Sequence, residues 1–171
     1  MAISITQMMP GDWSEVSRIY KEGIDTGNAT FETAVPLAWD DWSRHKILEC
    51  CLVARGTEGI IGWAALSHAS PRKVYVGVAE VSIYVSVAGR GNGVGAELLR
   101  ELIHRSELCG IWTLQAAIFP ENQVSVRLHE RCGFRAVGVR QRLARMAYGE
   151  YEGKWRDILF LERRSAHVGL E

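Results

Sequence analysis

The sequence predicts a single domain of the α/β (α+β) class, in which helices cover both faces of a mixed β-sheet. The length of 171 residues suits one domain with a genuine hydrophobic core. Hydrophobic residues make up 47%, charged residues 23%, and only four prolines occur, which excludes a disordered or low-complexity chain. Segments with strand and helix periodicity alternate in the order βααβββαβαββ.

The first five elements follow from local patterns. Residues 3–8 predict a strand, and Asp12 is placed to cap a helix that runs to about Ile24. A second helix is expected after Pro36, with an apolar side formed by Leu37, Trp42, Ile47 and Leu48. Residues 51–54 and 60–66 are apolar runs joined by a short segment with two glycines, which predicts a hairpin.

The longest β-rich run, residues 74–87, predicts the next strand. Ala79, Val81, Ile83 and Val85 share one face, while Glu80, Ser82 and Tyr84 share the other. A glycine-rich loop and a strongly amphipathic helix ending near Gly110 follow. Residues 112–118 then predict a strand, residues 120–131 a helix, and residues 134–139 and 158–161 the final two strands.

Composition limits the partners and the location of the protein. Twenty basic and twenty acidic residues give zero formal net charge, so we expect no nucleic-acid or membrane partner. The N-terminus lacks a targeting pattern and no run is long enough for a membrane span, so we expect a cytoplasmic protein. The four cysteines form no C-x-x-C pair and the histidines form no H-E-x-x-H motif, so we expect free thiols and no metal.

Four glycines within residues 89–95 lie between a strand and a helix and predict an anion site. Glycines let backbone N–H groups point into one concavity, and the start of the helix adds partial positive charge. A flexible turn is the simpler interpretation. The loop lacks the Lys-Ser or Lys-Thr of a P-loop, but Gly91-x-Gly93-x-x-Ala96, with Glu121 downstream, loosely fits a dinucleotide fingerprint.

A second motif on the next helix favours a different ligand. Asn122-x-x-Ser125-x-x-x-His129-x-x-x-Gly133-Phe134, taken with Arg90-x-x-Gly93-x-Gly95, resembles the GNAT acyl-CoA N-acyltransferase superfamily over residues 3–161. Within it, the chain resembles the phosphinothricin and methionine sulfoximine acetyltransferase branch, through Glu80-Val-Ser-Ile-Tyr-Val85, Val126-Arg-Leu-His-Glu130 and Gly153-Lys-Trp-Arg-Asp157.

The resemblance implies an architecture and an activity. It implies a GNAT-like domain over residues 1–163, with a tail at 164–171, built on a central, twisted, largely antiparallel sheet of about seven strands. It also implies a homodimer that uses acetyl-CoA to acetylate the α-amino group of a small amino acid or analogue by direct attack. Alternatives are a dinucleotide-binding oxidoreductase, a non-catalytic CoA-binding module, and an acetyltransferase for aminoglycosides, polyamines or protein amines.

Catalytic and cofactor-binding residues are assigned on the same basis. Glu80 projects from the polar face of its strand beside the glycine loop and is the candidate general base, with a solvent-facing position as the alternative. Asn122 is equally compatible with capping its helix. The full cofactor-binding set comprises Ile83, Tyr84, Val85, Arg90, Gly91, Gly93, Val94, Gly95, Ala96, Asn122 and Ser125.

The remaining candidates concern the leaving thiolate and the amine. His129 stands where the superfamily often has a tyrosine acid, and it is either a catalytic acid or a structural helix histidine. Arg72 suits an amino-acid carboxylate and, with Lys73, Tyr75 and Phe31, forms the expected substrate-binding set beside Glu80. Arg72 and Lys73 could equally be solvated charges next to Pro71.

Overall fold

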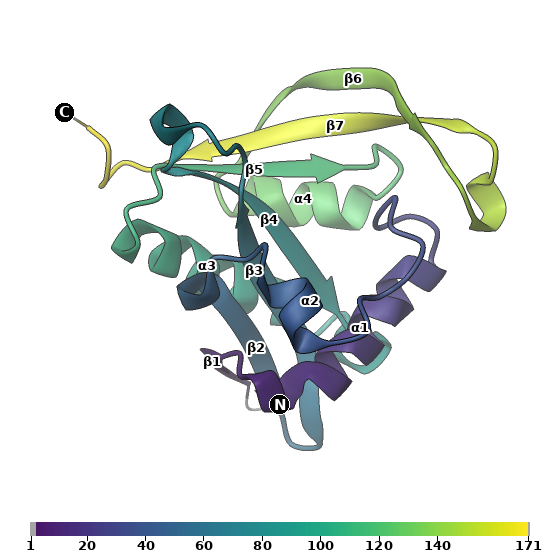
Figure 1. The fold of residues 1–171 in the computed structure, drawn as a ribbon, viewed down its shortest axis with the longest axis horizontal. Coiled ribbons are helices and arrows are strands. Elements are labelled where there is room, and N and C mark those ends of the chain that lie inside the picture. Colours follow the sequence, from purple (N-terminus) through teal and green to yellow (C-terminus); the bar gives the residue numbers. More distant parts are fainter. Residues whose placement is uncertain (1–2, 171) are drawn as a thin grey trace.

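The computed structural model describes residues 3–170 and contains a seven-stranded sheet with the strand order β1-β2-β3-β4-β5-β7-β6 (Figure 1). The strands are β1 (Ser4–Gln7), β2 (Cys51–Gly56), β3 (Gly59–His68), β4 (Val78–Val85), β5 (Thr113–Ile118), β6 (Arg135–Arg145) and β7 (Trp155–Arg164). The helices are α1 (Trp13–Asp25), α2 (Trp39–Ser43), α3 (Val94–Leu108) and α4 (Gln123–Arg131). Their order matches the predicted βααβββαβαββ, with short 3₁₀ turns between elements.

The sheet is mixed and largely antiparallel, as predicted, because only β4 and β5 run parallel. These two strands pair only at residues 78–80 with residues 113–115. Beyond that point β4 stays paired with β3, and β5 with β7. Figure 1 shows β4 and β5 diverging towards their C-terminal ends, which parts the sheet at its centre.

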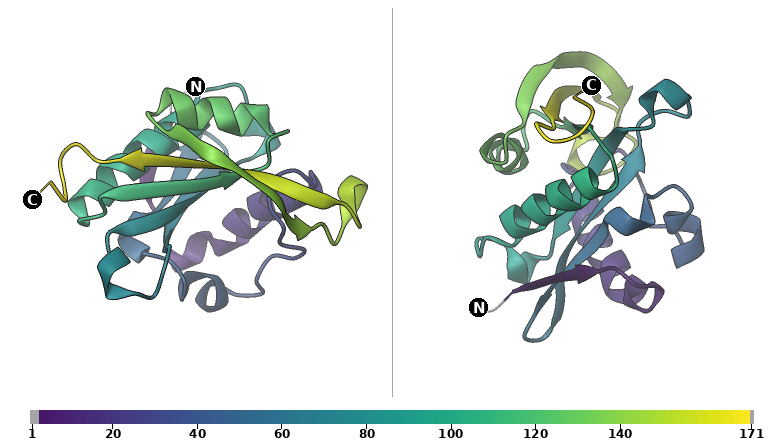
Figure 2. Two further views of the ribbon diagram at one scale, coloured as in Figure 1. Left: turned by 90° about the horizontal axis from the view of Figure 1, so that it is seen from above. Right: turned by 90° about the vertical axis from the view of Figure 1, so that its left-hand side faces the viewer.

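Helices cover both faces of the sheet, as Figure 2 shows. The apolar stripe of α3 packs with Ala79, Val81, Ile83 and Val85 on one face, whereas α1 and α2 pack with Tyr84 and Trp63 on the other. The predicted alternation along β4 is therefore confirmed. It follows that Glu80 and Ser82 share the face of Tyr84, opposite α3.

The predicted second helix is wrong in length. Helix α2 has only five residues, Leu37 before it is 96% exposed, and Leu48 belongs to the 3₁₀ turn η2 (Leu48–Cys50). Ile47 is extended, and its amide donates to the carbonyl of Leu66 on β3 at 2.9 Å. The chain leaves the helix because this long-range pairing with the sheet replaces the next helical turn.

The β-rich run at residues 74–87 is also shorter than predicted. Lys73–Tyr75 forms the 3₁₀ turn η3 and Val87–Gly89 forms η4, so only Val78–Val85 is strand. At Gly77 a Cβ atom would lie 2.0 Å from the ring of Trp112, so this position needs glycine for the close approach of the two segments. Strands β6 and β7 are both longer than predicted.

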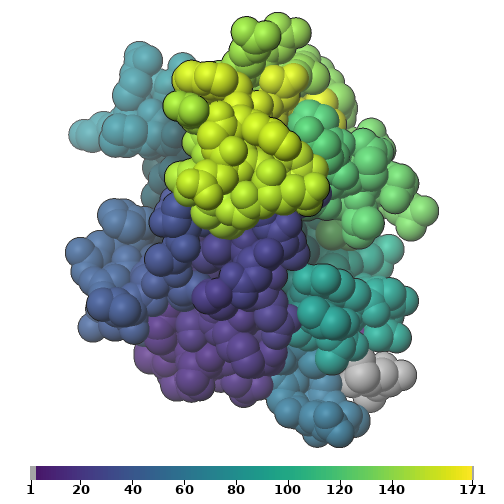
Figure 3. Space-filling model, turned by 90° about the vertical axis from the view of Figure 1, so that its right-hand side faces the viewer, coloured from purple at the N-terminus to yellow at the C-terminus, as the bar shows by residue number. Residues whose placement is uncertain are grey.

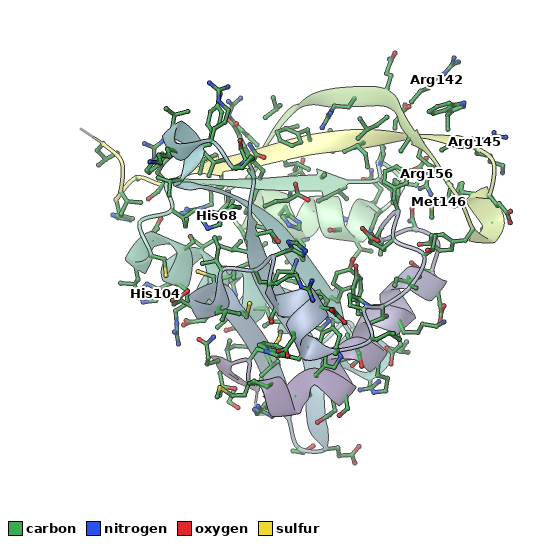
Figure 4. All side chains as sticks on the ribbon, in the orientation of Figure 1. His68, His104, Arg142, Arg145, Met146 and Arg156 are labelled. Atoms are coloured by element: carbon green, nitrogen blue, oxygen red, sulfur yellow. The ribbon has the colours of Figure 1, made fainter. Side chains whose placement is uncertain are left out.

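The hairpin that joins β6 and β7 folds over the segment after α1 and contains the 3₁₀ turn η5 (Gly149–Tyr151). Figure 3 shows this hairpin (yellow-green) lying on that segment (indigo). The hydroxyl of Tyr148 donates to the carbonyl of Thr30 at 2.8 Å. Arg156 and Met146 lie on the inner, buried side of the hairpin, whereas Arg142 is exposed on its outer side (Figure 4).

The C-terminal residues stay attached to the domain. The amide of Ser165 donates to the carbonyl of Trp112, and its hydroxyl donates to Glu107 on α3. None of the helices within residues 3–170 has the length and apolar character needed to cross a membrane.

Candidate active site

The divergence of β4 from β5 opens a cavity of about 390 Å³, which we call the central cavity. It draws its lining from the segment after α1, from β4, from β5 and from α4. Its polar and aromatic lining residues are Tyr20, Thr30, Phe31, Glu32, Lys46, Ser67, Glu80, Ser82, Tyr84, Phe119, Asn122, Ser125 and His129. The topology thus brings Glu80 and His129, predicted from separate motifs, to one cavity.

A second cavity of about 300 Å³ adjoins the first, and we call it the loop-side cleft. Both are lined by Ala29, Ile83, Tyr84 and Asn122, while Val85 and Arg90 line only the loop-side cleft. The cleft therefore leads from the central cavity towards the glycine loop. Two reactants held in the two spaces would meet at the end of β4.

Backbone amides of β4 face the gap left by β5. The amide of Ser86 donates to the carbonyl of Ile61 on β3 at 2.9 Å. Because the direction of hydrogen bonding alternates along an antiparallel strand, the N–H groups of Val85 and Ile83 point away from β3. β5 no longer pairs with β4 at this level. These two amides are therefore available to a ligand in the loop-side cleft.

The glycine loop presents further backbone donors. Gly91 and Gly93 have φ angles of 77° and 80°, a left-handed conformation that favours glycine, and Gly93 immediately precedes α3. Val94, Gly95 and Ala96 form the first turn of α3. The Ala96 N–H donates to the carbonyl of Gly93 at 3.0 Å, whereas the N–H groups of Val94 and Gly95 precede the first helical hydrogen bond and have no partner within the helix. Together with the helix dipole this arrangement suits a diphosphate.

Glu80 lies on β4 directly opposite Ser67 on β3 and lines the central cavity. Its side chain is exposed, and it forms no ion pair with a described residue. It is therefore free to accept a proton from a molecule in the cavity, directly or through water.

Asn122 caps α4, as one of its two predicted roles requires. Its Oδ1 accepts the Ser125 amide at 3.2 Å, and its Nδ2 donates to the carbonyl of Asn28 at 3.0 Å. The side chain therefore connects α4 to the segment after α1 at the boundary of the two cavities. Ser125, three residues later, also lines the central cavity.

His129 is buried, with Nδ1 2.8 Å from the carbonyl oxygen of Ser125. A carbonyl can only accept, so Nδ1 carries the proton and Nε2 holds the lone pair in the neutral ring. Burial lowers the pKa of His129, partly opposed by this hydrogen bond. The imidazole is thus a neutral group with an acceptor nitrogen, in a residue that lines the central cavity.

Two tyrosines on the same cavity stay protonated. Burial raises the pKa of Tyr20 to about 12 and raises that of Tyr84 further. Their rings pack edge to face, with centroids 4.9 Å apart, and Tyr84 also stacks on Trp63. These contacts make the α1 side of the cavity an aromatic wall.

Of the predicted substrate-binding residues beside Glu80, one lies in the central cavity and three lie outside its lining. Phe31 lines the central cavity and packs edge to face on Phe119. Arg72, Lys73 and Tyr75 are exposed on and beside η3, outside the lining of the cavity, and Arg72 lies over the Tyr75 ring. Their link to the site is the connection between two strands. η3 lies between β3 and β4, and the Ser67–Glu80 pair is near the ends of these strands that it joins.

The sequence reasoning missed two features of the site. Lys46 lines the central cavity, and buried Arg156 holds its wall. Nη1 of Arg156 donates to the carbonyl of Gly27 at 3.0 Å and Nη2 donates to Oδ1 of Asn28 at 2.8 Å. Both contacts span more than a hundred residues of sequence, so no local pattern could reveal them.

A divided sheet with a glycine loop at the start of a helix, free β4 amides and a carboxylate in the adjoining cavity is an arrangement that suits an acyl-CoA N-acyltransferase. Comparison with known proteins is more specific. The profile of the Acetyltransferase (GNAT) family matches residues 13–134, so the chain belongs to this family. The earlier resemblance to GNAT enzymes is confirmed, and the oxidoreductase and non-catalytic alternatives are not supported.

Individual relatives cover nearly the whole chain. L-methionine sulfoximine/L-methionine sulfone acetyltransferase of Pseudomonas aeruginosa is 29% identical in an alignment 167 residues long, which covers 95% of this chain and 94% of that protein. Phosphinothricin N-acetyltransferase of Alcaligenes faecalis is 31% identical in an alignment 171 residues long, which covers 95% of this chain and 82% of that protein.

A solved structure extends the likeness to the cofactor. The crystal structure of a GNAT superfamily phosphinothricin acetyltransferase from Sinorhizobium meliloti, in complex with AcCoA, matches with a TM-score of 0.86 at 27% identity. The match covers 100% of this chain and 92% of that one. The chain is an acetyl-CoA-dependent acetyltransferase, and the loop-side cleft with its backbone donors fits this cofactor.

Within residues 3–170 no group of three or more His, Cys, Asp or Glu side chains is gathered as metal ligands would be.

Proposed function

We propose that the enzyme transfers the acetyl group of acetyl-CoA to the α-amino group of a small amino acid or analogue, such as phosphinothricin, methionine sulfoximine or methionine sulfone. The observation that carries this proposal is the exposed carboxylate of Glu80 in a cavity of about 390 Å³ that adjoins the loop-side cleft. A cavity of this size suits one small molecule. The names of the two relatives point to the same class of acceptor.

Glu80 is the proposed general base. Bound acetyl-CoA supplies the acetyl group as an activated thioester. Glu80 accepts a proton from the substrate ammonium, directly or through water, and so frees the nitrogen lone pair for attack on the carbonyl carbon. A C–N bond forms as the C–S bond breaks, and the sulfur leaves as a thiolate that must gain a proton. Direct transfer to the amine is favoured over an acyl-enzyme. No cysteine lines either cavity, and the His129 nitrogen nearest the Ser125 hydroxyl, Nδ1, carries a proton and cannot act as a base for that serine.

Backbone groups hold and polarise the thioester in this proposal. The amides of Ile83 and Val85, flanking Tyr84, bind the cofactor, and one of them donates to the thioester oxygen. The diphosphate lies against the loop from Arg90 through Gly91 and Gly93 to Val94, Gly95 and Ala96. Ser125 and the capping residue Asn122 contact the cofactor from α4.

His129 is the proposed proton donor to the leaving thiolate. Its lowered pKa means that the ring is neutral at the start, so Nε2 must first accept a proton released by the amine. The resulting imidazolium is a stronger acid than an ordinary one and passes its proton to sulfur. Because Nδ1 already donates to Ser125, only Nε2 takes part in this exchange.

Substrate contacts are proposed at two places. Phe31 packs on the side chain of the substrate inside the central cavity. Arg72, Lys73 and Tyr75 act at its outer end, where η3 joins the strands that carry Ser67 and Glu80.

A panel of amines tests the function. Release of free CoA thiol and the mass of the product are measured with methionine sulfone, methionine sulfoximine and phosphinothricin, and with an aminoglycoside and a polyamine as negative controls. The highest kcat/KM is expected for one of the amino acids. Acetyl-CoA, and not NAD, should also raise the melting temperature, because only a ligand that binds the native state does so. A preference for the aminoglycoside or polyamine would contradict the proposed substrate class.

We also propose a cytoplasmic homodimer. The cysteines are free thiols, which suits a reducing compartment. β6 is an edge of the sheet and exposes Val137 and Val139, apolar side chains that a second copy would cover. Light scattering should give the mass of a dimer, and V137E/V139E should shift it to that of a monomer. A monomeric wild-type enzyme would refute the dimer.

A further inference from the structure

Lys46 is the cationic residue of the central cavity. It lies between α2 and η2, and its Nζ donates to the hydroxyl of Ser67 at 2.9 Å. Ser67 in turn lies directly opposite Glu80 across β3 and β4. The Lys46 ammonium is 5.3 Å from the ring centroid of Trp42. The three polar side chains of Lys46, Ser67 and Glu80 thus follow one another along the same wall of the cavity.

Its charge has no close partner among the described residues. No carboxylate lies within ion-pair distance of Nζ, although Glu80 and Glu32 line the same cavity. Burial lowers the pKa of Lys46, with the more distant Cys51, Glu80 and Glu32 acting in the opposite direction. A partly desolvated ammonium without a counter-ion is unfavourable unless a ligand supplies one.

We infer that Lys46 binds the α-carboxylate of the acceptor amino acid, an inference that rests on the proposed function. In an amino acid the carboxylate and the ammonium are attached to the same carbon atom. If the ammonium faces Glu80, the carboxylate lies within a few ångströms of it, and the polar side chains next to Glu80 on this wall are Ser67 and then Lys46. The wall of the cavity therefore presents a base and a cation in the order that a zwitterion requires.

Arg72, expected from the sequence to take this carboxylate, is less well placed. It is exposed, lies outside the cavity lining and rests on Tyr75. Among the Lys and Arg side chains of residues 3–170, Lys46 alone lines the central cavity. A carboxylate held beside Glu80 in the central cavity would therefore meet Lys46 first, and Arg72 is left for contacts at the outer end.

The experiment compares two substrates that differ only at the carboxyl group. Wild type and K46M are assayed with methionine sulfone and with its α-carboxamide, which has no negative charge. We expect kcat/KM of K46M to fall about 10- to 100-fold for the acid, as loss of a charged hydrogen bond does, and to change little for the carboxamide. K154M is the matched control, because Lys154 also lies over an aromatic ring but outside the cavity.

The outcomes separate this inference from the proposed function. Equal losses for the acid and the carboxamide would overturn it, because Lys46 would then act on Glu80, on the substrate side chain or on folding. Undiminished activity of K46M with the acid would overturn it too. If wild type acetylates neither compound nor any other amino acid, the proposed function itself fails. Thermal unfolding with and without acetyl-CoA reports folding, and K46Q, which keeps a donor for Ser67, should show the same substrate dependence.

Discussion

The Cζ atom of Arg156 on β7 lies 3.8 Å from the ring centroid of Phe119, the residue that follows β5. The ring of Tyr151 lies on the guanidinium at 3.9 Å, and Arg156 is only 2% exposed. The same group donates to the carbonyl of Gly27 and the side chain of Asn28. One buried cation thus joins β7, β5 and the segment that lines the central cavity.

Replacing this arginine should loosen the site. In R156K the ammonium cannot keep the planar stacking and all the hydrogen bonds at once. We expect the free energy of unfolding to fall by about 2–4 kcal/mol, chiefly from the lost bonds to Gly27 and Asn28. The ion pair with Glu121 adds little, because that carboxylate is half exposed. Urea unfolding measures the stability, and kcat/KM should fall as well.

The matched control for this change is R140K. Arg140 is an exposed arginine on β6, in the same hairpin but without a hydrogen bond from its side chain to another described residue. It should leave both stability and kcat/KM near the wild-type values. If R156K were as stable as R140K, the buried guanidinium would not be holding the cavity wall.

The role of Glu80 predicts a selective loss of turnover. E80Q keeps the size of the side chain but cannot accept a proton, so kcat should fall about 10²- to 10⁴-fold. The affinity for acetyl-CoA, measured by calorimetry, should stay at the wild-type value, because Glu80 does not line the loop-side cleft. E32Q, which removes the other carboxylate of the central cavity, should lose far less activity. Full activity of E80Q would exclude Glu80 as the base.

His129 should make the stability of the protein depend on pH. In the unfolded chain the pKa of a histidine is about 6.5, and burial lowers it in the folded state. Between the two values the unfolded chain binds more protons, so the free energy of unfolding must fall as the pH drops from about 7 through the folded-state pKa. H129N, which keeps a donor for the Ser125 carbonyl, should show a smaller fall in urea unfolding between about pH 7 and pH 5. An identical pH dependence would exclude this histidine as the cause.

Local patterns predicted the parts of the fold that depend on local geometry. The alternation from Ala79 to Val85 follows from the two-residue period of a strand, and it correctly placed Glu80 on the face opposite α3. The glycine loop could be predicted in the same way, because its signal is local. Gly91 and Gly93, which adopt the left-handed conformation, directly precede the first residues of a helix in the sequence.

Features of the site that depend on contacts between distant residues could not be predicted from the sequence. Lys46 reaches the cavity because Ile47 pairs with Leu66 and ends the second helix early. Arg156 and Asn28 are 128 residues apart in the sequence but share a hydrogen bond. Nothing in the residues around either side chain distinguishes it from a solvated surface charge, since burial is a property of the assembled sheet and not of a local period.

The loop itself provides the last prediction. Gly93 has a φ angle of 80° and open space where a Cβ would lie, so G93A costs only backbone strain, about 1–2 kcal/mol of folding free energy. Relief of that strain would reorient the N–H groups at the start of α3, so the affinity for acetyl-CoA should fall as well. Gly11 has equally open space without a left-handed conformation, so G11A should change neither quantity. Calorimetry of acetyl-CoA binding by both variants tests whether the diphosphate depends on this turn. If G93A binds acetyl-CoA as tightly as G11A does, the diphosphate does not depend on the turn, and the cofactor must be held chiefly by β4 and α4.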